Sequence, residues 1–370
     1  MSYRTEPFRI AMAGPADLTG LADLIRAGAL DPLHIAAILV KTEGNGGVND
    51  FTREYTCSAI AITLAPYLHM TPAEVEHRIA VVVSGGTEGI LSPHATIFAR
   101  VPTEAAARPG NDPKPKRLAI GIAATRDFLP HEIGRAAQIE ATTSAVNAAM
   151  RDAGISRVED VHWVQIKCPL LTAERVQAAR RAGFEPVTEN AYKSMAYSRG
   201  ASALGVAVAL GEIAAPVAEQ AVLQDWSLCS GVASASAGIE LRNNIVMVLG
   251  NSDEALGDCV IAHAVMQDAI DASAVIAALG HAGELTEART IDASRIINVL
   301  AKADPSPDGT LRGWRHTMLD DTDISATRHV RAAVGGVIAG VTGCPAVFVS
   351  GGAEHQGPPG GGPVAVICRI

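Results

Sequence analysis

Serine, lysine and arginine recur in the same order in three parts of this chain, and together they could hydrolyse an amide. A serine followed by glycine ends an apolar run in IAVVVSGGTEG (Ser84) and in AVFVSGGAEHQG (Ser350), and a weaker copy, WSLCSGVAS, surrounds Ser230. In both strong copies a glutamate stands four positions after the serine. Internal repetition has to be settled before any single motif is interpreted, so we treat the chain as three related parts.

Each part also carries a lysine near the end of an earlier apolar run and an arginine ahead of a stretch rich in small residues. These residues are Lys41, Lys167 and Lys302, and Arg53, Arg199 and Arg331. Arg328 is a second candidate in the third part, but small residues follow Arg331 directly, as they follow Arg199. One copy of such a pattern is usually a turn, a helix cap or a solvated charge. A duplicated scaffold has no need to keep three polar residues in order, so the repetition favours function.

The residue types define the chemistry. A lysine that is partly buried near like charges loses proton affinity, because both effects disfavour the ammonium form. It can then act as a general base and take the proton of a serine hydroxyl. Arginine stays charged and offers a planar set of donors to a carbonyl oxygen, and the backbone N–H after each serine can hold an oxygen that becomes negative. The pattern predicts acyl transfer, most simply amide hydrolysis, without selecting one of the three serine–lysine pairs.

The elements that must position these residues alternate between strands and helices. Apolar runs predict strands at 8–12, 34–40, 117–124, 161–166, 244–249 and 295–300 and before each serine, and helical spacing predicts helices at 15–28, 52–68, 131–153 and 258–272. This order predicts an α/β protein with three homologous units. Unit A spans 1–105, a linker rich in Pro and charge spans 106–116, unit B spans 117–242 and unit C spans 243–370. A pseudo-threefold axis would bring the three sets of polar residues to one centre.

Composition is typical of a compact globular protein. Of 370 residues, 48% are hydrophobic and 19% are charged, which argues against disorder. A formal charge of −9 gives no reason to expect nucleic acid or an anionic membrane as a partner. The first residues lack the apolar segment of a signal peptide, and no apolar run reaches the roughly 18 residues of a membrane span. The 6 scattered cysteines fit a reducing compartment, so we expect a soluble cytoplasmic protein.

Other chemistries fit the sequence less well. SGGTEG and SGGAEHQG lack the Lys and Ser/Thr of a phosphate-binding P-loop, and the absence of GxSxG disfavours an α/β-hydrolase elbow. His94, His316 and His355 could do chemistry, but no histidine pair has metal-ligand spacing. The segment GPPGGGP after Ser350 could hold a hard cation through backbone carbonyls. No organic cofactor is expected.

Eight longer motifs together resemble one family. They are KTEGNGGVND, FTREYTCSA, VSGGTEGILSPH, KCPLLT, YSRGASALG, ASASAGIE, RGWRHTMLDDTDI and SGGAEHQGPPGGGP. Over essentially its whole length the chain is similar to the cyanuric acid hydrolase and barbiturase family of ring-opening amidohydrolases, and more so to the cyanuric acid hydrolases. The resemblance implies three homologous α/β units around a pseudo-threefold axis, with a central β-barrel-like core and helices outside. It also implies hydrolytic opening of cyanuric acid to carboxybiuret, which loses carbon dioxide to give biuret.

The resemblance further implies roles for individual residues. In this family the second serine–lysine pair is taken as catalytic, which implies Ser230 as nucleophile and Lys167 as base. The other residues would bind and orient the ring: Lys41, Arg53, Ser84, Gly85, Arg199, Gly231, Lys302, Arg331, Ser350 and Gly351. The family also implies a homotetramer and a structural divalent cation, Mg²⁺ or Ca²⁺. The matching metal positions are Asp304, where the family has Glu, with Ala353, Gln356, Gly357, Pro358 and Gly361.

Two other functions stay open at this point. A barbiturase would use the same site, because barbituric acid differs from cyanuric acid by a CH₂ in place of an NH. A non-catalytic protein that binds small cyclic imides would need the same pocket without turnover. Mutation of Lys167 separates the second possibility from the first, because an enzyme loses turnover and a binding protein loses only affinity.

Overall fold

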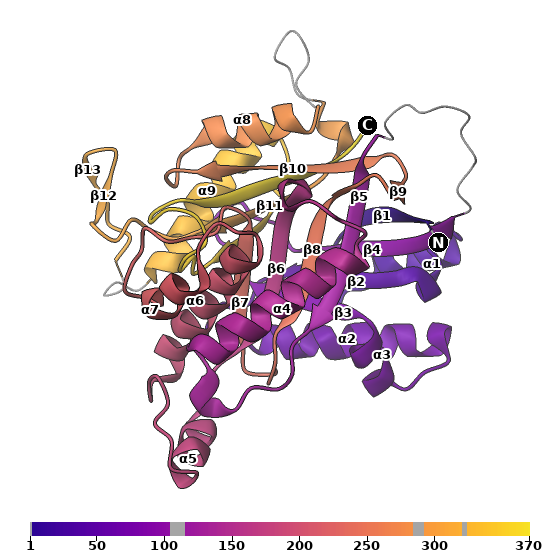
Figure 1. Cartoon of the computed structure of the whole chain (residues 1–370). Helices are drawn as coiled ribbons and strands as arrows, with labels where there is room; N and C mark the ends of the chain where they lie inside the picture. The colour runs from indigo at the N-terminus through magenta and orange to yellow at the C-terminus, as the bar shows by residue number, and fades with distance from the viewer. Residues whose placement is uncertain (1, 104–114, 284–291, 320–323) are drawn as a thin grey trace.

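A computed structural model describes residues 2–103, 115–283, 292–319 and 324–370, and these ranges form three main sheets (Figure 1). The sheet of unit A contains β1 (Ser2–Ala11), β2 (Ile35–Thr42), β3 (Ala80–Gly85) and β4 (His94–Thr103). The sheet of unit B contains β5 (Arg117–Ala124), β6 (Val161–Pro169), β7 (Ala233–Gly238) and β8 (Ile245–Ser252). The sheet of unit C contains β10 (Cys259–Met266), β11 (Ile296–Ala303), β14 (Phe348–Gly351) and β15 (Gly362–Arg369).

All three sheets have the same topology. The strand orders are β3-β2-β4-β1, β7-β6-β8-β5 and β14-β11-β15-β10, and only the second and third strands of each unit are parallel neighbours. A register shift recurs at the start of the second strand, between Ile35 and Ala37, Val161 and Trp163, and Ile296 and Asn298. The shared order and the shared bulge confirm the prediction of three homologous α/β units.

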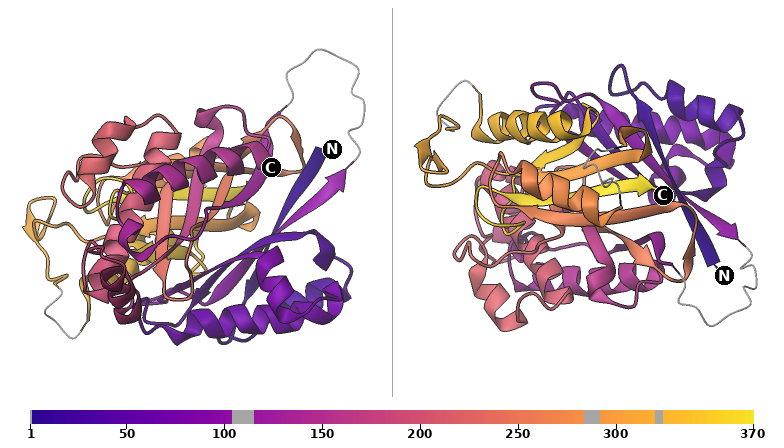
Figure 2. Two further views of the ribbon diagram at one scale, coloured as in Figure 1. Left: turned by 60° about the horizontal axis from the view of Figure 1, so that its bottom comes forward. Right: turned by 90° about the horizontal axis from the view of Figure 1, so that it is seen from above.

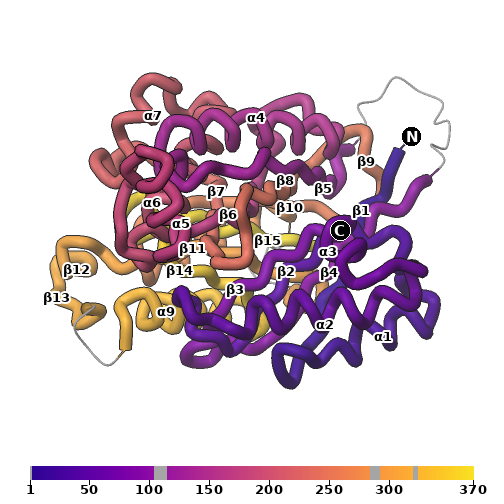
Figure 3. The backbone as a smooth tube through the Cα atoms, turned by 90° about the horizontal axis from the view of Figure 1, so that it is seen from below, coloured from indigo at the N-terminus to yellow at the C-terminus, as the bar shows by residue number. Residues whose placement is uncertain are grey.

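The helices cover the outer faces of the sheets. Unit A has α1 (Thr19–Arg26), α2 (Phe51–Leu68) and α3 (Pro72–Arg78); unit B has α4 (Ala136–Asp152), α5 (Ala173–Arg181), α6 (Ala191–Ala209) and α7 (Ala215–Ala221); unit C has α8 (Ala272–His281) and α9 (Ala326–Thr342). Figures 2 and 3 show the three units around a common centre with these helices outside. Within the described ranges, none of the helices combines the length and apolar character that a membrane crossing requires.

The inner faces of the sheets pack on one another at the centre. Each sheet has its own core against its helices, and a further buried cluster draws Leu39 and Phe98, Trp163 and Leu249, and Phe348 from the three units. Strands buried on both faces read as continuous apolar runs, which explains why the sequence marked them clearly. In the described part of the chain the sheets remain separate in their hydrogen bonding and do not close into one barrel.

The predicted boundary between units B and C is wrong. The strand expected at 244–249 is β8, and it pairs with β5 and β6 of unit B. The first strand of unit C is β10, within the stretch 258–272 that was predicted as a helix. A short apolar run does not by itself distinguish a strand from a buried helix. The run NIVMVL was therefore predicted as the first strand of unit C. The linker predicted at 106–116 lies outside the described residues except for its last two positions.

Two short pairings complete the strands. β9 (Ala255–Leu256) pairs in parallel with β1, which links the end of unit B to the sheet of unit A. β12 (Thr310–Leu311) and β13 (Trp314–Arg315) form a small hairpin of unit C. Figure 1 shows this hairpin projecting from the body of the molecule.

Candidate active site

Each unit places a lysine opposite a serine on its parallel strand pair. Lys41 is in register with Ser84, and Lys302 is in register with Ser350. Lys167 is in register with Ser236, which occupies the same place on β7. All three lysines are buried, because the strands that carry them are covered on both faces. The strand register therefore places three lysine–serine pairs at equivalent positions.

The prediction that Ser230 is the serine of unit B is wrong. Ser230 lies before β7, forms an isolated bridge with Gln356, and its hydroxyl is hydrogen bonded to Glu212. The N–H of Gly231 also donates to Glu212, at 2.9 Å. Neither Ser230 nor Gly231 lines the cavity that holds Ser84 and Ser350.

A signal in the sequence identifies Ser236. SGGTE, SAGIE and SGGAE share a serine, a small residue, a glycine and a glutamate four positions after the serine. SGVAS at Ser230 lacks the glutamate. Ser230 matched the pattern of the other units because a glycine directly follows it. The strand register instead places Ala237 at the position of Gly85 and Gly351.

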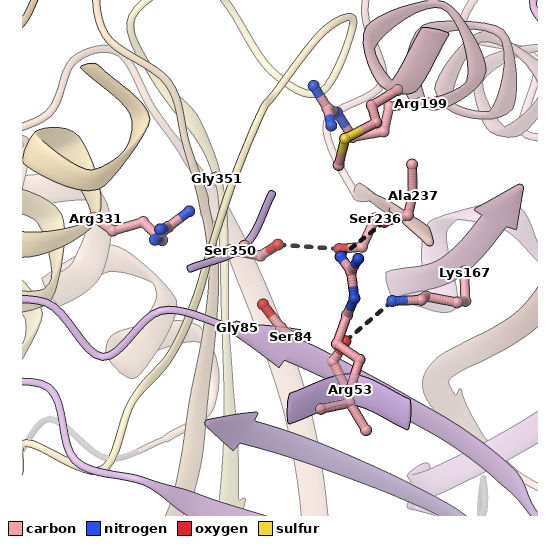
Figure 4. A pocket seen from close by; sticks show the side chains of 13 residues that line it. Arg53, Ser84, Gly85, Lys167, Arg199, Ser236, Ala237, Arg331, Ser350 and Gly351 are labelled. Atoms are coloured by element: carbon pink, nitrogen blue, oxygen red, sulfur yellow. Dashed lines mark hydrogen bonds between the residues drawn. The ribbon is translucent and has the colours of Figure 1, made fainter. Parts of the chain in front are cut away.

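A small central cavity collects side chains from all three units (Figure 4). Its lining consists of Gly46, Arg53, Val83, Ser84, Gly85, Lys167, Met195, Arg199, Ser236, Ala237, Arg331, Ser350 and Gly351. All three serines and all three predicted arginines are present. Lys167 is the lysine of the trio in this lining, whereas Lys41 and Lys302 lie behind their serines. Within this lining, the arginine of unit C is Arg331 and not Arg328.

Local helix structure positions the arginines. The Asp50 carboxylate accepts a hydrogen bond from the N–H of Thr52 and caps α2, so Arg53 lies in the first turn. Asn190 caps α6 in the same way, and Arg199 lies where small residues let α6 approach α4. A Cβ at Gly205 would lie only 2.7 Å from the Cβ of Thr142, so glycine is required for that close approach.

Two of the lysines are held by their serines. Lys41 Nζ donates to Ser84 Oγ at 3.1 Å and to the carbonyl of Gly85 at 3.1 Å. Lys302 Nζ donates to Ser350 Oγ at 3.1 Å and to the carbonyl of Gly351 at 2.9 Å. The same contacts in two units indicate a shared, symmetric arrangement.

The pair of unit B is different. Lys167 Nζ donates to the carbonyl of Val83 at 3.1 Å and forms an ion pair with Glu240 Oε1 at 3.2 Å. The hydroxyl of Ser236 lies 3.0 Å from that of Ser350 (Figure 4). Lys167 is thus the member of the trio that combines access to the cavity with a carboxylate partner.

Burial changes the proton affinity of these groups. Burial and the nearby Arg331 lower the pKa of Lys41 well below its ordinary value. Burial and the charge of Arg199 lower the pKa of Lys302 to about 7. Burial acts to raise the pKa of Glu240, but the charges of Lys167 and Arg53 outweigh it and the net shift is downward, so this carboxylate is ionised.

The profile of a protein family described as "Amidohydrolase ring-opening protein" matches residues 6–369. The chain belongs to this family of ring-opening amidohydrolases. A cyanuric acid amidohydrolase of Bradyrhizobium diazoefficiens is 60% identical over 98% of this chain and 97% of its own length. One from Pseudomonas sp. strain ADP is 54% identical over 99% of both chains. A solved cyanuric acid hydrolase structure with 54% identity covers 100% of both chains with a TM-score of 0.94. Another, from A. caulinodans, has 47% identity, 99% coverage of both chains and a TM-score of 0.89.

The arginines of this amidohydrolase are braced unequally. Arg199 makes a two-pronged ion pair with Glu354, with Nε at 2.7 Å. Arg331 makes the same pairing with Glu88, with Nε at 2.8 Å. Arg53 has no carboxylate partner among its hydrogen bonds: its guanidinium donates to backbone carbonyls, and its buried Nε has no partner in the described residues.

The loop after Ser350 packs against the ends of β10 and β11. A Cβ at Gly361 would lie 2.0 Å from the carbonyl oxygen of Met266, and one at Gly362 would lie 2.2 Å from that of Lys302. Only glycine fits at these two places. The amidohydrolase therefore has a tightly wound loop of backbone carbonyls directly beside the strand that carries Lys302.

Asp304 lies at the edge of this loop. It accepts a hydrogen bond from the N–H of Ala353, and burial, reinforced by the negative charge of Glu354, raises its pKa to about 7. No group of three His, Cys, Asp or Glu side chains in the described ranges could hold a metal ion. A cation bound here would therefore depend on backbone carbonyls together with Asp304. That all-oxygen donor set fits Mg²⁺ or Ca²⁺.

A larger hollow of about 310 Å³ adjoins the central cavity. The two share Gly46, Met195, Arg199, Arg331 and Gly351. The outer hollow adds Asn45, Gly47, Tyr192, Ser325, Thr327, Arg328 and Gly352. It offers an approach to the central cavity.

Proposed function

We propose that this amidohydrolase opens the ring of cyanuric acid. The observation that carries the proposal is the central cavity, in which each unit contributes one serine and one arginine. Cyanuric acid is itself threefold symmetric, with alternating carbonyl and N–H groups, so three similar sets of donors match its three edges. Relatives named cyanuric acid amidohydrolase at up to 60% identity over nearly the whole chain support the choice of substrate.

In the proposed reaction Ser236 is the nucleophile and Lys167 is the base. The hydroxyl oxygen of Ser236 attacks a ring carbonyl while Lys167 takes its proton, and the same proton passes to the ring nitrogen as the C–N bond breaks. Water then hydrolyses the acyl-enzyme to release carboxybiuret, which loses carbon dioxide to give biuret. Arginine side chains and the backbone N–H groups after the serines would stabilise the negative oxygens.

Two contacts support the choice of the middle pair. Lys167 lines the cavity, whereas Lys41 and Lys302 do not. Ser236 lines the same cavity from the register position opposite Lys167, and its hydroxyl lies 3.0 Å from that of Ser350. The runner-up is the Lys302–Ser350 pair, since burial lowers the pKa of Lys302 to about 7, near the value that suits a general base.

Turnover assays separate the possible substrates. Purified protein is expected to consume cyanuric acid, followed by loss of its ultraviolet absorbance, and to consume barbituric acid far more slowly. The CH₂ of barbituric acid offers no N–H to a backbone or side-chain acceptor, and a buried polar group left unpaired costs about 1–3 kcal/mol. Consumption of barbituric acid alone would identify a barbiturase, and binding of either imide without turnover would identify a binding protein.

The outer two serines are proposed to orient the ring. Ser84→Ala and Ser350→Ala are each expected to raise KM about tenfold while kcat changes less, because one hydrogen bond to the substrate is worth about 1 kcal/mol or somewhat more. Steady-state kinetics of the two variants test this division of roles. A large loss of kcat in Ser350→Ala with KM unchanged would move the chemistry to the third unit.

We also propose a structural cation at the loop, held by Asp304 and by carbonyls of Ala353, Gln356, Gly357, Pro358 and Gly361. When bound it would neutralise Asp304 beside Glu354 and fix the loop that follows Ser350. Chelation with EDTA is expected to lower the melting temperature by several degrees, and Mg²⁺ or Ca²⁺ to restore it, because a ligand that binds only the folded state stabilises it. An unchanged melting temperature together with metal-free protein by elemental analysis would contradict this assignment.

A homotetramer in the cytoplasm completes the proposal. The exposed face of α2 carries Phe51, Tyr55 and Ile62, which are 79%, 58% and 62% exposed. Large apolar side chains on one helix face are typical of a surface that another subunit covers. Light scattering of the purified protein measures the assembly directly, and a monomer at micromolar concentration would contradict it.

A further inference from the structure

The glutamates that follow the three serines form a ring of ion pairs that is broken at one place. Glu88 of unit A pairs with Arg331 of unit C, and Glu354 of unit C pairs with Arg199 of unit B. Continuing the cycle, Glu240 of unit B should pair with Arg53 of unit A. It pairs with Lys167 of its own unit instead, at 3.2 Å.

Arg53 and Glu240, which do not pair with each other, have different surroundings from the paired residues of the ring. Arg53 NH1 donates to the carbonyl of Ala237 at 3.2 Å (Figure 4), and Arg53 Nε is buried without a partner. The Glu240 side chain is 20% exposed and lies beside Lys167, which is 3% exposed. Glu240 does not line the cavity, so it can act on a substrate only through Lys167.

The backbone explains why the ring breaks in unit B. The glycine two residues after the serine has a positive φ in units A and C, +107° at Gly86 and +72° at Gly352, and turns the chain there. A Cβ at either place would lie 2.6 Å from the guanidinium of Arg331 or Arg199. Gly238 has no such φ and continues β7, and a Cβ there would lie 2.3 Å from Glu240 Oε1.

We propose that Glu240 is a positioning residue for Lys167, and that it makes the middle pair the reactive one of three otherwise similar pairs. The inference rests on the proposed function and extends it to a residue outside the cavity. Glu88 and Glu354, its counterparts by position, form their ion pairs with arginines. The geometry thus assigns two different tasks to one repeated glutamate.

The proton balance defines the task. In the reactive form Lys167 is the neutral amine beside Glu240. When Ser236 attacks, its O–H bond breaks and a new N–H bond forms on Lys167, so an ammonium group appears beside an ionised carboxylate. Glu240 keeps its charge and takes no proton, and Lys167 later delivers the proton to the leaving ring nitrogen. The carboxylate stabilises the charge that develops during the reaction. It also fixes the orientation of the amine, as the aspartate of a serine protease fixes its histidine.

Several charged or titratable groups surround this pair. Arg53 and Cys57 approach it from α2, Arg175 from α5 is close enough to Glu240 to feel its charge, and Arg199 and Cys168 lie on the side of unit B. Arg53 is the cation of this set that, together with Lys167, acts to lower the pKa of Glu240. Removal of the Glu240 charge therefore takes away the carboxylate that acts on both Lys167 and Arg53.

The test replaces each glutamate with its uncharged counterpart. Glu240→Gln is expected to lower kcat on the order of 10²-fold with little change in KM. It is also expected to shift the acid limb of the kcat/KM profile to lower pH by about one unit, because an opposite charge at this distance raises the pKa of a lysine and its loss lowers it. Glu88→Gln and Glu354→Gln are the matched controls, expected to raise KM and leave the acid limb in place.

A second variant is designed to displace the Glu240 carboxylate without changing any charged residue. Gly238→Ala needs no unusual φ but places a methyl group where Glu240 now lies, so the carboxylate has to move. It is expected to reproduce the loss of kcat seen in Glu240→Gln. If Glu240→Gln behaves like the two control variants, or if Gly238→Ala retains wild-type kcat with an intact fold by circular dichroism, the inference is overturned.

A measurement that needs no turnover separates this inference from the choice of substrate. In protein labelled with ¹⁵N-lysine, the Nζ signal of Lys167, assigned with Lys167→Arg, is titrated in wild type and in Glu240→Gln. A midpoint that falls in the variant supports the coupling even if no imide is hydrolysed, in which case only the proposed function fails. A midpoint that stays unchanged overturns the role of Glu240, whatever the enzyme acts on.

Discussion

Ser236→Ala is expected to reduce kcat for cyanuric acid by at least about 10³-fold, because removal of a catalytic nucleophile leaves only binding and oxyanion stabilisation. Ser230→Ala is expected to keep kcat within a few-fold of wild type. Ser230 is fully buried, and its hydroxyl interacts with Glu212 and the N–H of Val232 outside the cavity. Its loss should therefore appear as a stability change of about 1 kcal/mol in denaturant unfolding.

The two variants check each other. The two serines are six positions apart, and each variant removes one serine hydroxyl. Any difference in kcat therefore reflects the position of the hydroxyl and not the type of substitution. Mass spectrometry of the protein quenched during turnover should find an added acyl group on the peptide that contains Ser236. Full activity of Ser236→Ala together with an inactive, folded Ser230→Ala would contradict the register argument.

The sequence predicted the repeat and most of the site. Five of the six strands predicted outside the serine motifs lie in the units to which they were assigned, and Arg53, Arg199, Arg331, Ser84 and Ser350 line one cavity. The reason is physical: strands buried on two faces are marked by apolar runs, and the polar residues at their ends stand out against them.

The errors have a common cause. The strand before Ser230 and the boundary at 242 were both inferred from short apolar runs, and such runs do not reveal which strand pairs with which. Pairing of β6 with β7 fixes Ser236, and pairing of β8 with β5 fixes the end of unit B. The glutamate four residues after Ser84, Ser236 and Ser350 carried the missing information. Glu88 and Glu354 pair with arginines of neighbouring units, and Glu240 pairs with Lys167.

The departure from threefold symmetry could not be predicted from the sequence. SAGIE differs from SGGTE and SGGAE by an alanine at the second position and an isoleucine at the fourth, and neither residue type specifies where Glu240 points. The direction depends on Gly238 continuing β7 when Gly86 and Gly352 turn away. Three similar sets of residues suit a threefold-symmetric ring, and the pairing of Glu240 with Lys167 makes one set different from the other two.

Lys167→Met is expected to lower kcat by at least about 10³-fold, a loss as large as that from removing the nucleophile, since residues that act as one unit are not additive. Methionine keeps much of the volume of lysine and removes the amine. The double variant Lys167→Met/Ser236→Ala should be little worse than either single variant. Because Lys167→Met leaves Glu240 without its ion-pair partner, Lys167→Met/Glu240→Gln serves as the control for folding.

Two observations distinguish Lys167, the proposed base, from Lys41 and Lys302, which donate hydrogen bonds to serines. Small primary amines in the buffer are expected to restore part of the activity of Lys167→Met, increasingly as pH rises and more of the added amine is neutral. Lys41→Met and Lys302→Met should show no such rescue, because their amines are buried behind Ser84 and Ser350 and do not reach the cavity. A Lys302→Met variant that loses turnover and regains it with added amine, beside an active Lys167→Met, would instead place the reaction at the third pair, where burial lowers the pKa of Lys302 to about 7.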